Sequence, residues 1–336
     1  MSVRSFGRTD EAEILEIAIA SDGGAEARII TWGAALRDLV VQGPAGPQRV
    51  VLGLDTLDHY VRHSPFFGAV VGRYANRIGD ARFRLGGREV DLVPNENGNE
   101  LHGGPASFGR RPWSLLGHDS RRVHLGLVSE DGEGGFPGRL FALATYEFVA
   151  AATLRVTLQA ISDRATPVNL TLHGYYNLDG SDDARDHRLL VSADFWTPVD
   201  EELIPTGAIA PVAGTRLDFR EARPVRSDPY SDLDGNFVLR RNPPEGLAHA
   251  ATLASDRSGL AMQLWTTEPG LQVYDGHLIR VPVPGLGGLR LQPYSGIALE
   301  PQRFPDAPNH AHFPNSIVEP GQVSRQISEL KFASVS

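Results

Sequence analysis

The chain of 336 residues contains no cysteine, and Lys331 is its only lysine. Without cysteine there is no disulfide, no thiolate nucleophile and no cysteine-ligated zinc or iron–sulfur site. A single lysine close to the C-terminus argues against a catalytic Schiff base and against a phosphate-binding P-loop. Any chemistry must therefore come from carboxylates, histidines, arginines and neutral polar groups.

Long hydrophobic runs are also missing. No stretch approaches the roughly 18 uncharged apolar residues that a membrane helix needs. The arginines near the N-terminus are not followed by an apolar segment, because Glu11, Glu13 and Glu16 interrupt it. A formal net charge of -9 argues against nucleic acid and against a polybasic membrane contact. We expect a cytoplasmic protein that binds neither nucleic acid nor membrane.

The pattern that is present has a period of two. Leu154, Val156, Leu158 and Ala160 alternate with polar residues, which is typical of a strand with one buried face. Turn signals such as Asn97-Gly98 separate many such runs. Further strands are predicted at 28–41, 49–54, 123–127, 139–149, 188–193, 259–266, 270–275 and 289–300. Without a linker or repeat, the sequence predicts an all-β fold: one large antiparallel β-sandwich domain over residues 1–336 with few, short helices.

Ionisable residues gather where these strands meet turns. In 166–173, Asn169, Thr171 and His173 share one face of a predicted strand, with His173 at its end. Glu300 ends another predicted strand before a proline-bounded loop, and His102 lies in the turn-rich segment 95–104. Taken singly, each has an ordinary alternative: a histidine bonded to the next loop, or a surface acid paired with Arg303.

Taken together and in order, these segments resemble the aldose 1-epimerase (galactose mutarotase) family over nearly the whole chain. The matching motifs are GRYANRI at 72–78, ELHGG at 100–104, NLTLHGYYNL at 169–178, LDGNFVL at 233–239, LQVY at 271–274, GIALEPQ at 296–302 and PDAPN at 305–309. The resemblance implies a galactose mutarotase-like β-sandwich with an open cleft and no metal or organic cofactor. It also implies that Glu300 is the general base and His173 the general acid. The positions implied to hold the sugar are Asn76, Arg77, His102, Asp234 and Gln272.

The residue types suit anomer interconversion independently of the resemblance. Ring opening removes the proton of the C1 hydroxyl and protonates the ring oxygen, so one base and one acid must act together. A carboxylate with a reference pKa of about 4.3 is ionised at neutral pH, and a histidine near 6.5 supplies or accepts a proton readily. An acidic Asp234 suits a hydroxyl rather than a phosphate, which favours an unphosphorylated sugar. Monomer and homodimer both remain open.

Two departures from the family pattern bear on specificity rather than on the reaction. Gly235 stands where a histidine is common, and Asp275-Gly276-His277 stands where Thr-Gly-Asn is usual.

Three other functions stay in view. A glycoside hydrolase would pair Glu300 with Asp234, and a non-catalytic sugar-binding module would need only the β-sandwich and its aromatics. A metal enzyme would use His310 and His312, which have no third ligand at zinc-like spacing.

Overall fold

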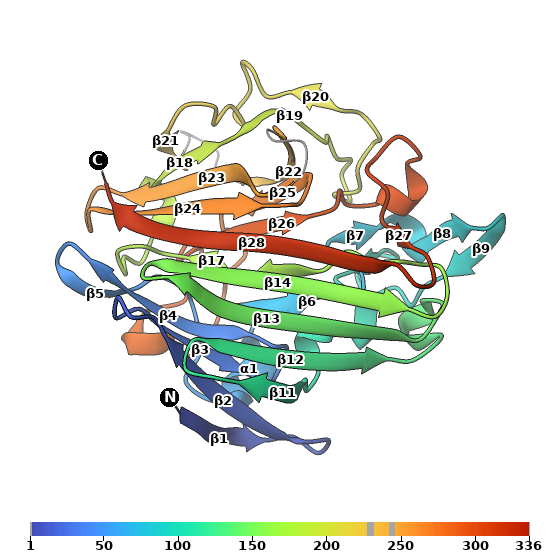
Figure 1. The fold of residues 1–336 in the computed structure, drawn as a ribbon. Helices are drawn as coiled ribbons and strands as arrows, with labels where there is room; N and C mark the ends of the chain where they lie inside the picture. Colours follow the sequence, from blue (N-terminus) through green and yellow to red (C-terminus); the bar gives the residue numbers. More distant parts are fainter. Residues whose placement is uncertain (1, 227–231, 242–245, 336) are drawn as a thin grey trace.

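The computed structural model describes residues 2–226, 232–241 and 246–335 and consists mainly of antiparallel strands (Figure 1). The largest sheet packs face to face with two others, of six and five strands, and shares a buried core with both. The predicted all-β sandwich is confirmed.

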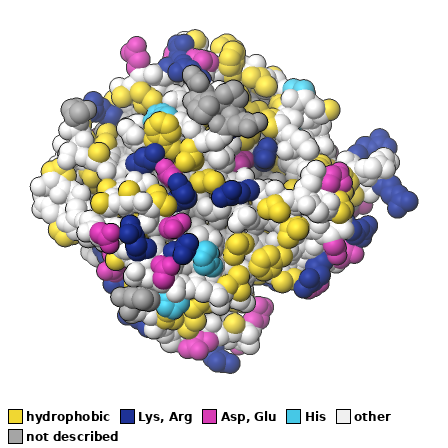
Figure 2. Space-filling model, viewed as in Figure 1, with side chains coloured by type: hydrophobic (Ala, Val, Ile, Leu, Met, Phe, Trp, Pro, Cys, Tyr) yellow, Lys and Arg dark blue, Asp and Glu magenta, His cyan; other side chains and the backbone are white. Residues whose placement is uncertain are grey.

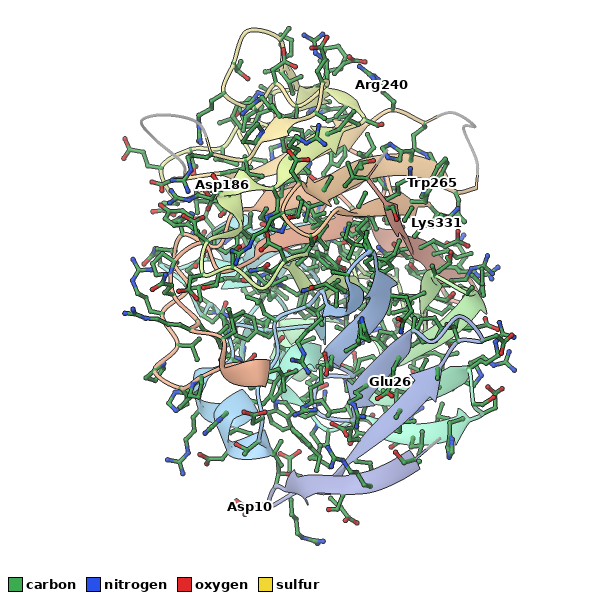
Figure 3. All side chains as sticks on the ribbon, turned by 90° about the vertical axis from the view of Figure 1, so that its left-hand side faces the viewer. Asp10, Glu26, Asp186, Arg240, Trp265 and Lys331 are labelled. Atoms are coloured by element: carbon green, nitrogen blue, oxygen red, sulfur yellow. The ribbon has the colours of Figure 1, made fainter. Side chains whose placement is uncertain are left out.

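The larger sheet has nine strands, each pairing antiparallel with its neighbours. In spatial order they are β11 (Ser114–His118), β12 (Arg122–Ser129), β13 (Leu140–Ala150), β14 (Thr153–Ser162), β28 (Val323–Ser334), β24 (Leu260–Thr266), β23 (Ala248–Ser255), β18 (Arg188–Val191) and β21 (Arg223–Pro224). The outer face carries charges of both signs (Figure 2). One ion pair of this sheet joins Arg155 to Glu329. Lys331 lies over the ring of Trp265 at 4.6 Å, and the two side chains lie close together in Figure 3.

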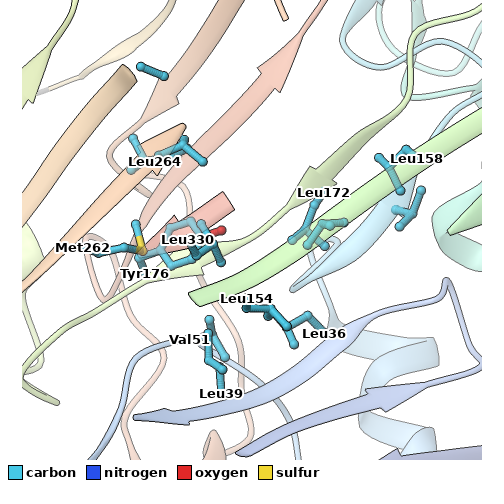
Figure 4. Close-up of a cluster of buried hydrophobic side chains, with 14 of the residues drawn as sticks. Leu36, Leu39, Val51, Leu154, Leu158, Leu172, Tyr176, Met262, Leu264 and Leu330 are labelled. Atoms are coloured by element: carbon cyan, nitrogen blue, oxygen red, sulfur yellow. The ribbon is translucent and has the colours of Figure 1, made fainter. Parts of the chain in front are cut away.

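The second sheet has six strands and lies behind the first in Figure 1. Its order is β17 (Tyr175–Tyr176), β26 (Ile297–Gln302), β25 (Gly270–Tyr274), β22 (Asp234–Leu239), β19 (Ala193–Trp196) and β20 (Ala210–Pro211). Leu154 and Leu330 of the larger sheet share one buried cluster with Tyr176, Leu271 and Leu299 of the smaller sheet (part of it in Figure 4). Because side chains alternate along a strand, the other face of this sheet carries the polar residues of β22, β25 and β26.

The remaining elements are a third sheet, which packs against the inner face of the larger one, and short two-stranded ladders. A five-stranded sheet contains β1 (Ser2–Arg8), β2 (Glu13–Ala20), β3 (Glu26–Ile30), β4 (Leu36–Gly43) and β5 (Gly46–Arg49). Four two-stranded ladders join β6 (Ala69–Val71) to β16 (Thr171–His173), β7 (Arg77–Ile78) to β10 (Glu100–Leu101), β8 (Arg82–Leu85) to β9 (Arg88–Asp91), and β15 (Thr166–Pro167) to β27 (Ile317–Val318).

Helices are few and short in the described ranges, as predicted. The one α-helix, α1 (Leu57–His63), begins at Thr56, whose hydroxyl accepts the backbone N–H of His59. Seven 3₁₀ turns span Gly79–Ala81, Gly104–Ala106, Phe108–Arg110, Glu133–Gly135, Ala184–Asp186, Leu286–Gly288 and Ala307–Asn309. None of the helices described is long and apolar enough to cross a membrane.

Several predicted strands need correction. The run 28–41 contains parts of two strands, β3 and β4, joined by a turn, and 188–193 contains the whole of β18 and the first residue of β19. Of the predicted strand 49–54 only Arg49 lies in a strand, as the last residue of β5, and residues 50–54 make only isolated bridges. Residues 289–296 form no strand, although Leu291 is buried like Val50 and Leu54. Apolar loop residues that fill the core look like strand residues in a sequence, because burial alone does not require a ladder.

Candidate active site

The polar face of the six-stranded sheet brings together residues far apart in the chain. Gln272 on β25 lies opposite Glu300 on β26, and Asn236 on β22 lies opposite Gln272 on its other side. Asp234 lies opposite Tyr274, one step along the same face. Glu300 does not end its strand as the sequence suggested, since β26 continues to Gln302. The ladder to β25 fixes the Glu300 backbone.

His173 approaches Glu300 from the end of β16. Its Nε2 lies 3.6 Å from Glu300 Oε1, and both side chains are buried. The imidazole is nearly parallel to the rings of Tyr175, at 5.0 Å and 22°, and of Phe66, at 6.1 Å and 19°. These rings restrict the rotation of the imidazole, so its orientation toward the carboxyl group is set before any ligand arrives.

Burial dominates the electrostatics of this pair. It raises the pKa of Glu300 well above the usual value, and the nearby Asp234 carboxyl group acts in the same direction while Arg77 opposes it. Burial also lowers the pKa of His173 to about 4. Both shifts favour the uncharged forms, so the reference pKa values used for the sequence do not describe this site. A single proton shared by the pair therefore favours the carboxyl group.

His102 is held in one tautomer. Its Nδ1 accepts the backbone N–H of Asn76 at 3.0 Å, and its own backbone N–H donates to the Asn76 carbonyl. Burial lowers the pKa of His102 well below the usual value, so the ring is neutral. A neutral ring whose Nδ1 accepts carries its proton on Nε2. His102 therefore offers an N–H donor. The centroid of its ring lies 5.2 Å from that of the His173 ring.

Arg77 and Asp234 carry the charges of the site. The Arg77 guanidinium makes a two-pronged ion pair with Glu96, and its Nη2 lies 3.1 Å from Glu96 Oε1. Gln272 Nε2 donates to Asp234 Oδ1. Burial raises the pKa of Asp234, while Arg77 and the Gln272 hydrogen bond lower it. Arg77 thus lies close enough to influence both acidic groups on the sheet.

All seven residues predicted for the site lie in one region. Asn76, Arg77, Asp234 and Gln272 line one small pocket. Gln272 lies opposite Glu300 and Asn76 bonds His102, and His173 contacts both Glu300 and His102. The sequence did not identify Glu96, Phe66, Tyr175 or Asn236 as part of the site. Tyr175 and Asn236 lie inside quoted motifs and Glu96 lies in the turn-rich segment 95–104, which is a usable signal, whereas Phe66 had none. A larger cavity lies between residues 48–53 and 285–289, and none of the seven predicted site residues lines it.

The ordinary alternatives for these residues can now be compared with the geometry. Arg303 pairs with Glu268 at 3.3 Å, and Glu300 is 2% exposed, so Glu300 is not a surface acid paired with Arg303. His310 lies 3.1 Å from Asp306 and His312 bonds the Gly207 carbonyl. The residues described contain no group of three or more side chains able to hold a metal ion.

Fold and site define the class of protein: a large antiparallel β-sandwich with a buried carboxyl–imidazole pair on the polar face of one sheet. The aldose 1-epimerase family profile matches residues 16–331. Galactose mutarotase of Rattus norvegicus is 38% identical over 314 residues, covering 91% of this chain and 90% of its own length. Aldose 1-epimerase of Escherichia coli (strain K12) is 35% identical over 327 residues, covering 94% of each.

Solved structures agree. An aldose epimerase homologue from C. elegans superposes with a TM-score of 0.91 at 30% identity, covering 96% of this chain and 99% of its own. Galactose 1-epimerase from Lactobacillus acidophilus NCFM has a TM-score of 0.86 at 28% identity, covering 100% of this chain and 99% of its own. This chain belongs to the aldose 1-epimerase family, which confirms the resemblance found in the sequence.

Proposed function

We propose that the protein is an aldose 1-epimerase that interconverts the α and β anomers of an unphosphorylated free aldose, with Glu300 as base and His173 as acid. The activity follows from its relatives, two of which are named galactose mutarotase and aldose 1-epimerase. The observation that carries the mechanism is the 3.6 Å separation of His173 Nε2 and Glu300 Oε1. The two oxygens that exchange protons are both bonded to C1, so their acid and base must lie close together.

Ring opening then proceeds with balanced proton transfers. Glu300 takes the proton from the C1 hydroxyl, the C1–O5 bond breaks as C1=O1 forms, and His173 gives a proton to O5. Rotation about C1–C2 presents the other face of the aldehyde. For closure the proton returns from Glu300 to O1 while His173 takes back the O5 proton, so the enzyme ends as it began.

The pair needs only one proton throughout this cycle. Opening starts from ionised Glu300 with protonated His173 and ends with neutral Glu300 and neutral His173. Burial favours the arrangement in which both side chains are neutral, and this arrangement accompanies the open-chain aldehyde. The hydroxyls of a bound sugar supply hydrogen bonds to the charged arrangement, and these lower the free-energy cost of ionising the pair.

The other residues would hold the sugar while its ring is open. His102 offers a neutral Nε2–H, and Arg77 offers positive charge beside the reacting oxygens. Asp234 can accept a hydrogen bond from a sugar hydroxyl, and the Gln272 amide can both donate and accept one. Arg77 is already paired with Glu96, and two more acidic groups, Asp234 and Glu300, face it. This balance of charge favours a neutral sugar over a sugar phosphate.

Polarimetry tests the proposal. Freshly dissolved α-D-glucose, α-D-galactose, xylose and arabinose should each be followed with and without enzyme, and we expect faster decay of optical rotation for at least one of them. No acceleration with any free sugar would overturn the activity. Release of chromophore from nitrophenyl glycosides would instead favour hydrolysis through Glu300 and Asp234.

A further inference from the structure

A buried aspartate fixes a histidine at the rim of the site. Asp275, which follows β25, is 0% exposed. Its Oδ1 accepts the backbone N–H of His277 at 3.1 Å and lies 2.9 Å from His277 Nδ1, while its Oδ2 accepts the backbone N–H of Leu233 at 3.1 Å. The Asp275 backbone N–H donates to the Leu233 carbonyl as well. Asp275 therefore links His277 to the residue that precedes Asp234.

These bonds leave one ring nitrogen of His277 for a ligand. A carboxylate accepts hydrogen bonds, so Nδ1 is the donating nitrogen in the Asp275 contact. Within residues 2–226, 232–241 and 246–335 no hydrogen bond engages the other nitrogen, Nε2. The side chain is 18% exposed. It is thus held firmly on one side and accessible on the other.

A row of four rings relates His277 to the acid–base pair. Ring centroids are 5.0 Å apart from His173 to Tyr175, 6.1 Å from Tyr175 to Tyr274, and 5.0 Å from Tyr274 to His277. Tyr274 lies opposite Asp234 in the sheet. His277 therefore stands at the end of the site that contains Asp234, away from the group that protonates O5.

We propose that His277 is a specificity-determining residue, whose Nε2 hydrogen-bonds a hydroxyl of the sugar remote from C1. This inference rests on the proposed function. Nothing in the reaction requires the contact, because neither O1 nor O5 lies at this end of the row. The contact instead selects among aldoses that differ in the presence or orientation of one distant hydroxyl.

The charges around His277 favour a neutral hydroxyl as its partner. The Asp275 hydrogen bond raises the pKa of the imidazole, and the Asp275, Asp232 and Asp234 charges add to this effect, while burial opposes it. Arg280 is the nearby cation, and its Nη1 donates to the His277 backbone carbonyl. A sugar carboxylate or phosphate here would face three aspartates, so an anion is disfavoured.

Two substitutions separate ligand binding from support of the loop. In His277→Asn the amide can replace Nδ1 toward Asp275 but cannot reach the position of Nε2, whereas in His277→Gln the longer amide can approach that position. We expect His277→Asn to raise KM for the best sugar about three- to tenfold, the effect of one neutral hydrogen bond, with kcat nearly unchanged. His277→Gln should recover part of this loss.

Deoxy sugars identify the hydroxyl. Wild type and His277→Asn should be compared on the parent sugar and on its 2-, 3-, 4- and 6-deoxy forms. We expect one deoxy sugar to bind both proteins equally, because the hydroxyl that His277 contacts is already gone. The control is His124→Asn, a half-buried histidine bonded to Thr145 in the larger sheet, which should leave both constants unchanged.

The outcomes distinguish this inference from the proposed function. If wild type accelerates no free sugar, the proposed function fails. If wild type is active but His277→Asn matches it in KM on every sugar, the assignment of His277 is wrong. A fall in kcat with unchanged KM would also overturn it, because that result indicates a role in the reaction or in loop structure rather than in binding.

Discussion

Replacing Glu300 by glutamine keeps the shape of the side chain but removes the group that accepts the O1 proton. A positioned general base contributes roughly 10²–10⁴ in rate. At about 1.4 kcal/mol per factor of ten, the barrier should rise by about 3 to 5 kcal/mol. We expect kcat to fall by that factor with KM little changed, measured by polarimetry with the uncatalysed rate subtracted.

The same substitution makes a second, independent prediction about stability. Burial and the neighbouring Asp234 raise the pKa of Glu300 in the folded protein, so the folded state binds more protons than the unfolded chain once the pH exceeds the ordinary value of about 4.5. Stability of the wild type therefore falls as pH rises above that value. Glutamine does not ionise. Glu300→Gln should match the wild type in Tm near pH 4 and exceed it increasingly toward pH 8.

The matched control is Glu268→Gln. Glu268 is also a buried glutamate whose pKa is raised by burial, but it pairs with Arg303 outside the site. Its substitution should leave kcat within about threefold. The reasoning about Glu300 would be refuted if Glu300→Gln kept wild-type turnover. A Tm at pH 8 several degrees below that of the wild type would refute the electrostatic argument.

Three further predictions concern the surroundings of the pair. A pair that works with one proton loses its base when His173 is also protonated, near pH 4; kcat/KM measured across a pH series should therefore fall on the acid side near pH 4 and not near the ordinary histidine value of about 6.5. Glu96→Gln removes the charged partner of Arg77 and should raise KM about tenfold with a smaller effect on kcat, measured by initial rates of mutarotation. Gly68 has φ +64, and a Cβ there would lie 2.1 Å from the Leu36 carbonyl oxygen; Gly68→Ala should lower the free energy of unfolding by about 2 to 4 kcal/mol in urea titrations.

Alternation was enough to predict the fold class and the long strands. Leu154, Val156 and Leu158 are buried on β14 as their spacing indicated. It was not enough where apolar residues pack from loops, as in 49–54. It also misplaced the strand containing His173, because residues 168–170 form no ladder although both faces of this segment are buried. A period of two has meaning only where one face is exposed to solvent.

The site could be predicted from the sequence only as a set of residues. The resemblance named the seven positions, and the structure places them in one region. Which of them contact each other depends on the register between β22, β25 and β26, which pair residues up to 40 positions apart, as Asp234 with Tyr274. The Arg77–Glu96 ion pair is also formed between residues distant in the chain, and so is the Asn76–His102 hydrogen bond that sets the His102 tautomer. The pKa shifts of His173 and Glu300 follow from burial, which no local pattern encodes.

The polar face of the six-stranded sheet departs from the rule that buried polar atoms find partners. Asn236 Oδ1, Gln272 Oε1, Glu300 Oε2 and both amide atoms of Gln302 are buried without a hydrogen bond in the described part of the chain. Each such atom costs free energy in the folded protein, and a dry core would not retain five of them on three adjacent strands. A sugar carries hydroxyls that both donate and accept, so it can satisfy Gln272 and Glu300 in a way that no apolar ligand can. Under the proposed function, the unpaired polar atoms that cost stability are those that would bind a polyhydroxylated ring, so substitutions that fill the face with apolar side chains should stabilise the fold while abolishing binding.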